Sequence, residues 1–222
     1  MLHSWDLSPK EAIALQRRLA SMVELKPLPE PINLVGGADV GYSLHDNMAV
    51  AAVATYAFPS LEFNEIAYFN AKVSYPYIPG LLSFREVPLI LHAFQRLRKE
   101  PEVLLCDGQG VAHPRRSGLA SHLGLWLNLP AVGCAKTRLV GSHGQVGPRR
   151  GQFRSLMYRG ERVGVVLRTR TNVKPLYISA GHLADLVTSR KLVERCCLKT
   201  RMPEPIRRAH LEVQRAVRCR KE

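Results

Sequence analysis

Three strand-like stretches separated by very short connections constrain the fold of this chain most. They are Leu34–Tyr42, Met48–Phe58 and Leu61–Val73, and they are joined by the polar turn Ser43–Asn47 and by Pro59-Ser60. Connections of this length are typical of antiparallel hairpins, so the sequence predicts a three-stranded antiparallel meander.

The pattern changes after this meander, because apolar helical and strand-like stretches then alternate. Such alternation adds strands to the same sheet with helices packed on it, so we predict an α/β fold with a mixed β-sheet flanked by helices, in a single domain over 1–222. The glycine-rich residues 141–151 are predicted as a loop, and residues 218–222 as a disordered basic tail. The expected helices are Phe84–Lys99, Ser117–Leu127, Asp185–Leu198 and Glu204–Val217, and the expected strands are Val103–Cys106, Ala131–Cys134, Val163–Arg168 and Leu176–Ser179.

The net charge of the chain points to a polyanionic partner. Lysine and arginine number 32 against 18 aspartates and glutamates, which gives a formal charge of +14. Such an excess is typical of nucleic-acid-binding proteins, and arginine suits bidentate contacts with phosphate. The arginine pairs of the sequence are candidate contacts with a phosphate backbone, although each pair is also compatible with a simply solvated surface: Arg115-Arg116, Arg149-Arg150 and Arg207-Arg208.

Composition excludes several other classes of protein. A hydrophobic fraction of 46% argues against wholesale disorder, and the longest nearly apolar run, Met48–Phe58, is about half of what a membrane span needs. The first residues, MLHSWDLSPKE, show no secretory signal, and the five cysteines show no C-x-x-C spacing. We therefore expect a cytoplasmic protein whose cysteines are packing residues.

Two aspartates stand where an ordinary core would exclude them. Asp39 interrupts the apolar strand LVGGADVGY, and Asp107 directly follows the apolar strand VLLC. An ionised carboxylate at such a position is costly unless it is paired or binds a cation, and carboxylates from separate elements are how proteins hold magnesium. The alternatives are a turn-forming role for Asp107 ahead of Gly108, and a solvent-facing or arginine-paired role for Asp39.

Helix starts offer a competing explanation for a third carboxylate. Ser8, Pro9 and Glu11 form a capping box that predicts the first helix, and Ser83 to Glu86 has the same spacing at the start of the long second helix. Glu86 is therefore a candidate either for a helix cap or for the site, and the two roles are compatible.

The segment Tyr75–Gly80 contains two prolines around an aromatic and a branched apolar side chain. A stiff, exposed apolar tip is suited to wedging between stacked bases, whereas the alternative is a hydrophobic turn packed on the sheet. His113 and His210 lie beside arginines, where they are candidates for phosphate contact or proton transfer, or are ordinary surface or packing histidines.

Taken together, several blocks of sequence resemble the endonuclease V family from about residue 10 to about residue 217. In order, they are GADVGY, YPYIPGLLSFRE, DGQGVAHPRRSGLASHLG, PAVGCAKTRL, PLYISAGH and RMPEPIRRAH. The resemblance implies a ribonuclease H-like fold and a monomeric, magnesium-dependent repair enzyme for which manganese can substitute. It also implies cleavage of the second phosphodiester bond 3′ to hypoxanthine in DNA, leaving 3′-hydroxyl and 5′-phosphate ends.

The resemblance also assigns roles to individual residues. The catalytic residues it implies are Asp39, Glu86, Asp107, Lys136 and His210, with Asp39, Asp107 and Glu86 as metal ligands. The other implied groups are a wedge of Pro76, Tyr77, Ile78 and Pro79, and a pocket for the displaced base including Leu82, Gly108 and Gly110. From the residues themselves, we predict phosphate contacts from His113, Arg115 and Arg116. Two alternatives remain open: an inosine-specific endoribonuclease, and a catalytically silent nucleic-acid-binding protein.

Overall fold

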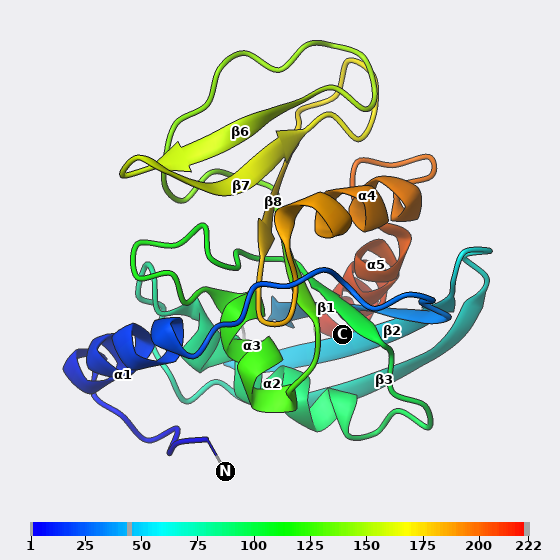
Figure 1. Ribbon diagram of the computed structural model, residues 1–222. Helices are drawn as coiled ribbons and strands as arrows, with labels where there is room; N and C mark the ends of the chain where they lie inside the picture. The colour runs from blue at the N-terminus through cyan, green and yellow to red at the C-terminus, as the bar shows by residue number, and fades with distance from the viewer. Residues whose placement is uncertain (1, 44–45, 220–222) are drawn as a thin grey trace.

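A single mixed β-sheet organises the molecule (Figure 1), and the computed structural model describes residues 2–43 and 46–219. Its eight strands lie in the order β3-β2-β1-β4-β5-β8-β7-β6. The β1–β4 and β4–β5 pairs are parallel and the others are antiparallel, which confirms the predicted mixed sheet. The strands are β1 (Leu34–Tyr42), β2 (Met48–Ala57), β3 (Phe63–Lys72), β4 (Val103–Cys106), β5 (Ala131–Ala135), β6 (Phe153–Tyr158), β7 (Glu161–Leu167) and β8 (Leu176–Ala180).

Helices cover both faces of this sheet. The helices α2 (Leu82–Phe94) and α3 (Leu119–Leu127) pack on one face, and α4 (Leu186–Cys196) and α5 (Glu204–Arg218) pack on the other. The remaining helix, α1 (Pro9–Ser21), lies outside α3 and contributes to a smaller apolar cluster that includes the start of α2. Buried aliphatic side chains therefore fill two layers, one on each side of the central strands.

The meander and the start of α1 agree with the sequence analysis. The pairs β1–β2 and β2–β3 are antiparallel, and Ser8 and Glu11 form both hydrogen bonds of the predicted capping box. Part of the predicted turn between β1 and β2, residues 44–45, lies outside the described residues. At the other end, α5 continues to Arg218, so the predicted tail is helical there, and residues 220–222 lie outside the described residues.

Two predictions about individual elements were wrong. The second helix ends at Phe94 instead of Lys99, because the backbone N–H groups of Arg98 and Lys99 donate to the Glu65 carboxylate and leave the helical ladder. The sequence analysis also missed β6, which pairs with β7 across Arg159 and Gly160. Both turn residues have positive φ, as a two-residue hairpin requires, and an arginine at such a position gives little warning of it.

None of the helices within the described residues is long and apolar enough to span a bilayer. All five cysteines are free thiols, and Cys219 alone among them is exposed. The buried cysteines lie in or beside the aliphatic layers of the core, in agreement with a packing role.

Candidate metal centre and the adjoining pocket

The two aspartates singled out in the sequence lie side by side because their strands are parallel neighbours. Ala38 on β1 pairs with Cys106 on β4, and the backbone N–H of Asp107 donates to the carbonyl of Ala38 at 3.2 Å. Asp39 and Asp107 each come one residue later, at the carboxyl side of this pairing. The side chains are 11% and 13% exposed, so both carboxylates are largely removed from water.

Close docking of α5 on β1 brings a third ligand-type side chain to the pair. Gly37 and Gly41 flank Asp39 on the same face of the strand, since alternate residues share a face. A Cβ atom at Gly37 would overlap the backbone at the start of α5, and one at Gly41 would overlap Val213. The two glycines thus allow the helix to approach until His210 contacts Asp39.

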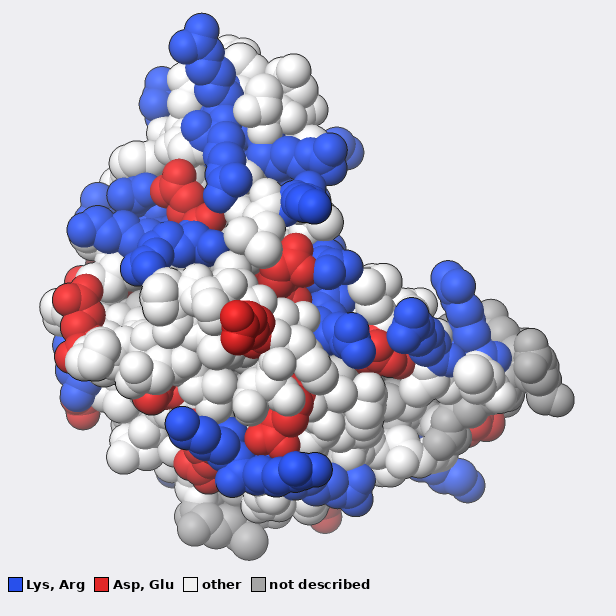
Figure 2. Space-filling model, turned by 90° about the vertical axis from the view of Figure 1, so that its right-hand side faces the viewer, with Lys and Arg blue, Asp and Glu red and all other residues white. Residues whose placement is uncertain are grey.

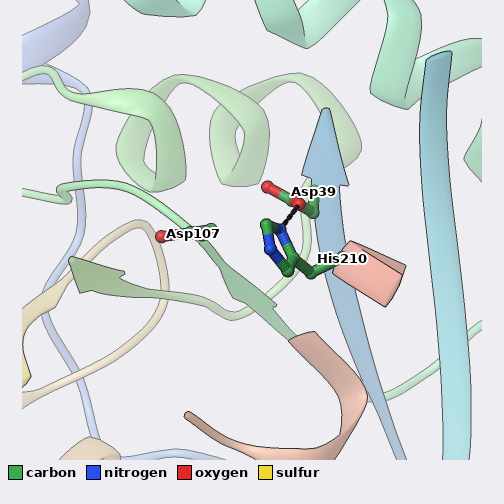
Figure 3. Close-up of side chains that lie close together, drawn as sticks. All are labelled: Asp39, Asp107 and His210. Carbon is green, nitrogen blue, oxygen red and sulfur yellow. Dashed lines mark hydrogen bonds and ion pairs between the residues drawn. The ribbon is translucent and has the colours of Figure 1, made fainter. Parts of the chain in front are cut away.

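The outcome is a cluster of three potential ligands (Figure 3). His210 Nδ1 lies 2.7 Å from Asp39 Oδ2, and one ligand atom each from Asp39, Asp107 and His210 lies within 4.8 Å of the others. Burial raises the pKa of the Asp39 carboxyl, and the negative charge of Asp107 raises it further. Two carboxylates held together in this way repel each other, and a dication between them relieves that repulsion.

Lys136, which directly follows β5, forms an ion pair with the Asp107 carboxylate. A positive charge thus already lies against one of the two aspartates. Its side chain is 40% exposed, so the ammonium group is also open to solvent and to an incoming anion.

Glu86 lies in the second layer of the site and does not cap α2. The N-cap of that helix is Leu81 without a side-chain hydrogen bond, so the predicted Ser83–Glu86 capping box is wrong. Glu86 instead accepts a hydrogen bond from the Tyr42 hydroxyl at 2.9 Å. Burial raises the pKa of its carboxyl to about 8, and the charges of Asp39 and Asp107 act in the same direction. Glu86 is not one of the three residues whose ligand atoms cluster within 4.8 Å.

A pocket of about 430 Å³ opens beside Asp107 and Lys136. This volume lies within the range of ordinary small-molecule sites, about 300–1,000 Å³. Leu82 and Gly108 line the pocket, as the resemblance implied for the displaced base, whereas Gly110 is not among its lining residues. The backbone N–H of Gly110 donates to Ser179 Oγ at 2.8 Å, which ties the DGQG turn to β8.

The proline-rich segment before α2 forms the rim of this pocket. Tyr77 and Pro79 line the pocket, and Tyr77 is 68% exposed, while Pro76 is exposed and Ile78 is half-buried. The neighbouring Tyr75 is the aromatic side chain that packs into the core. The hydrophobic-turn alternative therefore describes Tyr75, and Tyr77 is left as a free apolar tip.

The three predicted phosphate contacts are engaged within the protein. His113 is buried with Nε2 3.0 Å from the carbonyl oxygen of Gly80, and Arg115 donates to the same oxygen at 2.7 Å. Arg116 forms a 2.6 Å ion pair with Glu161. Burial lowers the pKa of the His113 imidazole to about 4, and the charge of Arg115 lowers it further, so the ring is neutral near pH 7. These groups hold the pocket rim in place.

The excess positive charge gathers at one end of the sheet. Residues 136–174 contain ten lysines and arginines and one acidic residue, Glu161. All ten lie within the part of the chain that the structure describes, and only Lys136 among them forms an ion pair. Figure 2 shows lysine and arginine side chains crowded over the top of the molecule, which is the β6–β7 end of the sheet. The ten are Lys136, Arg138, Arg149, Arg150, Arg154, Arg159, Arg162, Arg168, Arg170 and Lys174.

A mixed sheet with two aspartates at neighbouring central strands, beside a pocket and a basic surface, defines the class of the ribonuclease H-like nucleases. The similarity to known proteins agrees with this class and narrows it. The chain belongs to the endonuclease V family, whose sequence profile matches residues 17–211.

Relatives match this chain along nearly its whole length. The endonuclease V of Dehalococcoides mccartyi is 49% identical over 210 residues, which span 95% of this chain and 94% of that protein. A crystal structure of the Streptomyces avermitilis endonuclease V superimposes with a TM-score of 0.93 at 39% identity, covering 99% of this chain and 97% of that one. A single-residue variant of the Ciona intestinalis endonuclease V, in complex with a 23mer DNA containing an inosine followed by a ribo-adenosine, has a TM-score of 0.84 at 27% identity, covering 96% of this chain and 99% of that one.

Sequence reasoning missed several residues that shape the pocket. Gln16, Ser83 and Gln109 line it, and His122 lies directly behind Ser83. Gln16 carried one usable signal, since it is a buried amide on the apolar face of α1. Ser83 and His122 occurred within the quoted family blocks, but nothing in their spacing indicated that they form a pair.

Proposed function

We propose that this protein is a magnesium-dependent endonuclease that cuts the second phosphodiester bond 3′ to hypoxanthine in DNA and acts in DNA repair as a cytoplasmic monomer. The products are a 3′-hydroxyl and a 5′-phosphate. The observation that carries the proposal is the cluster of Asp39, Asp107 and His210 within 4.8 Å, directly beside a pocket of about 430 Å³. The complex of the Ciona relative with inosine-containing DNA supports the same substrate class.

The donor set fits a hard dication. Carboxylate oxygens are preferred ligands of both magnesium and manganese, so both cations are expected to serve. The charge balance supports the same conclusion, because two ionised carboxylates carry more negative charge than the one ammonium group of Lys136 offsets. Bound there, the cation would lower the pKa of a water molecule and neutralise charge on the phosphate oxygens.

The protein's own side chains supply the other catalytic roles. Asp39 and Asp107 hold the cation, and His210 orients Asp39 through its 2.7 Å contact or serves as a further ligand. Glu86, buried beside the cluster, would orient the attacking water or hold a second cation. The ammonium group of Lys136, which now pairs with Asp107, would stabilise the negative charge of the transition state.

The pocket and its rim account for recognition of the lesion. Extruding a base from a duplex costs a few kcal/mol, and the cost is least where pairing is already weak, as opposite hypoxanthine. Tyr77 at the rim fills the gap that the displaced base leaves, and the base enters the pocket beside Leu82 and Gly108. The basic β6–β7 end of the sheet supplies contacts with the phosphate backbone.

RNA is a second candidate substrate, since the DNA bound to the Ciona relative carries a ribo-adenosine after its inosine. One experiment tests both candidates and the silent alternative. Purified protein is incubated with magnesium and matched oligonucleotides that contain deoxyinosine, inosine or neither, in parallel with Asp39→Ala and Asp107→Ala. Cleavage confined to lesion strands and lost in both variants and in EDTA is expected. Full activity in EDTA or in either variant refutes the metal site, and binding without cleavage in every arm identifies a silent protein.

A further inference from the structure

A chain of hydrogen bonds leads from the wall of the pocket to the N-terminal segment. Ser83 lines the pocket, and its Oγ lies 3.0 Å from Nδ1 of His122. Nε2 of His122 lies 2.7 Å from Nε2 of His3, and Nδ1 of His3 lies 2.7 Å from the carbonyl oxygen of Ser4. Ser83 is 1% exposed and His122 is fully buried among aromatic rings, so water does not compete for the bond between them, whereas His3 is half-buried and its bond to Ser4 lies at the surface.

In each of these three hydrogen bonds, only one of the two atoms can be the donor. The carbonyl of Ser4 only accepts, so Nδ1 of His3 carries a proton and, in a neutral ring, its Nε2 accepts. His122 therefore donates from Nε2 and accepts at Nδ1, which leaves the hydroxyl of Ser83 as the donor of the last bond. Burial lowers the pKa of both rings, that of His122 to about 3, so both are neutral near pH 7.

The hydroxyl group of Ser83 therefore cannot donate a hydrogen bond to a molecule in the pocket. Its hydroxyl hydrogen is committed to His122, while the lone pairs of its oxygen remain available. We propose that Ser83 is a specificity-determining residue that accepts a hydrogen bond from the N1–H of the displaced purine, and that His122 and His3 are positioning residues that make Ser83 an acceptor only. The proposal deepens and rests on the proposed function.

The chemistry of the bases determines what such an acceptor selects. Hypoxanthine carries a hydrogen on N1, whereas N1 of adenine is an acceptor and would face the oxygen of Ser83 without a proton between them. A buried pair of acceptors without a hydrogen is costly, which works against adenine. Guanine also carries N1–H, so Ser83 separates lactam purines from adenine and leaves the distinction between hypoxanthine and guanine to other groups.

Gln109, which also lines the pocket, offers a second hydrogen-bond acceptor. The Nε2 group of Gln109 donates to the carbonyl oxygen of Thr137 at 3.0 Å, which fixes the orientation of the amide. Its Oε1 is buried without a hydrogen-bond partner. Buried acceptors of this kind are normally satisfied, so Oε1 of Gln109 is a further candidate to accept from an N–H donor of a ligand that reaches it.

His3 allows a test at a site that does not line the pocket. In His3→Phe, Nε2 of His122 loses its acceptor, its proton can move to Nδ1, and the hydroxyl of Ser83 becomes free to donate to adenine N1. Binding is measured in EDTA, without cleavage, to strands with a displaced hypoxanthine, guanine or adenine at one mismatched position. We expect His3→Phe and His122→Phe to lower the preference for hypoxanthine over adenine by about 10-fold, the effect of one hydrogen bond.

Matched variants separate this role from a structural one. Ser83→Ala is expected to weaken binding of hypoxanthine and guanine strands by about 10-fold and to leave adenine strands unchanged, while Ser83→Thr retains the preference. Trp5→Phe alters a ring that touches both His3 and His122 without joining the hydrogen bonds, so the preference is expected to persist. Equal losses for all three bases in Ser83→Ala, or a loss of preference in Trp5→Phe equal to that in His3→Phe, overturn the proposal.

Nitrogen-15 NMR of the unmodified protein tests the tautomers without any substrate. We expect His3 to be protonated on Nδ1 and His122 on Nε2, and a proton on Nδ1 of His122 refutes the inference. If the tautomers are as expected and the parent protein shows no preference for hypoxanthine strands, the proposed function fails and the hydrogen-bond chain stands.

Discussion

Replacing Gly37 by alanine places a methyl group against the backbone of Pro205 and Ile206, where α5 begins. Backbone atoms cannot rotate away, so α5 or β1 has to move. Overpacking of this kind costs about 1–3 kcal/mol. We expect Gly37→Ala to be destabilised by that amount, which for a domain of this size lowers the melting temperature by about 2–4 °C per kcal/mol.

Gly41 offers a graded version of the same perturbation. The alanine methyl at this position meets a side-chain carbon of Val213 instead of backbone. Val213→Ala makes room for it, so the double variant is expected to be more stable than the sum of the single changes predicts, by about 1 kcal/mol. Gly144→Ala is the matched control, because the nearest atom to its new methyl lies 3.9 Å away on the Arg154 side chain.

Urea denaturation and calorimetric titration with manganese measure the two consequences of this displacement. The same helix carries His210 to Asp39, so loss of stability and loss of cation affinity are expected to appear together in Gly37→Ala. Parental stability in Gly37→Ala refutes the steric argument. Lowered stability with unchanged cation affinity shows that the position of α5 does not control the metal centre.

Three further predictions concern the rim, the buried histidine and the basic surface. Tyr77→Ala is expected to leave stability within about 0.5 kcal/mol, because the side chain is 68% exposed, and to weaken lesion binding by about 1–3 kcal/mol; a large drop in melting temperature contradicts this. The pKa of His113 is lowered from 6.5 to about 4 in the folded protein, so this ring binds a proton more readily in the unfolded chain. Folding stability is therefore expected to fall by up to about 3 kcal/mol as pH falls from about 6.5 to about 4. In His113→Gln, the free energy of unfolding measured by urea denaturation is expected to depend less on pH across this window. Replacing Arg154 and Arg162 by glutamine is expected to reduce the salt dependence of duplex binding by about 0.9 in logarithmic slope for each lost contact, whereas Arg98→Gln, in the loop after α2, leaves the slope unchanged.

Sequence patterns predicted the order of the elements well where local rules decide them. The short connections around β2 admit only hairpins, and Ser8 with Glu11 defines the start of α1 through neighbours in the chain. Glu86 shows the limit of such rules. Its spacing from Ser83 satisfies the capping-box pattern, yet tertiary packing turns the carboxylate inward to the hydroxyl of Tyr42 and leaves the cap without a side chain.

The residues of the candidate site differ in how much the sequence reveals. An aspartate inside an apolar strand or directly after one is conspicuous, so Asp39 and Asp107 stand out without any structure. The contact of His210 with Asp39 joins residues 171 positions apart and depends on two glycines that no local pattern connects to a distant helix. The bonds between Ser83, His122 and His3 likewise follow from three-dimensional packing alone.

The cluster of Asp39, Asp107 and His210 depends on α5, and this dependence has a consequence for folding during synthesis. Chain growth proceeds from the N-terminus, and every strand of the sheet precedes α5 in the sequence, as do the ten basic residues of 136–174. A chain that has folded only as far as β8 therefore contains the whole sheet and these basic residues, but it lacks His210 and so lacks the cluster of three potential ligands. That cluster forms only when α5 packs over Gly37 and Gly41 and brings His210 to Asp39.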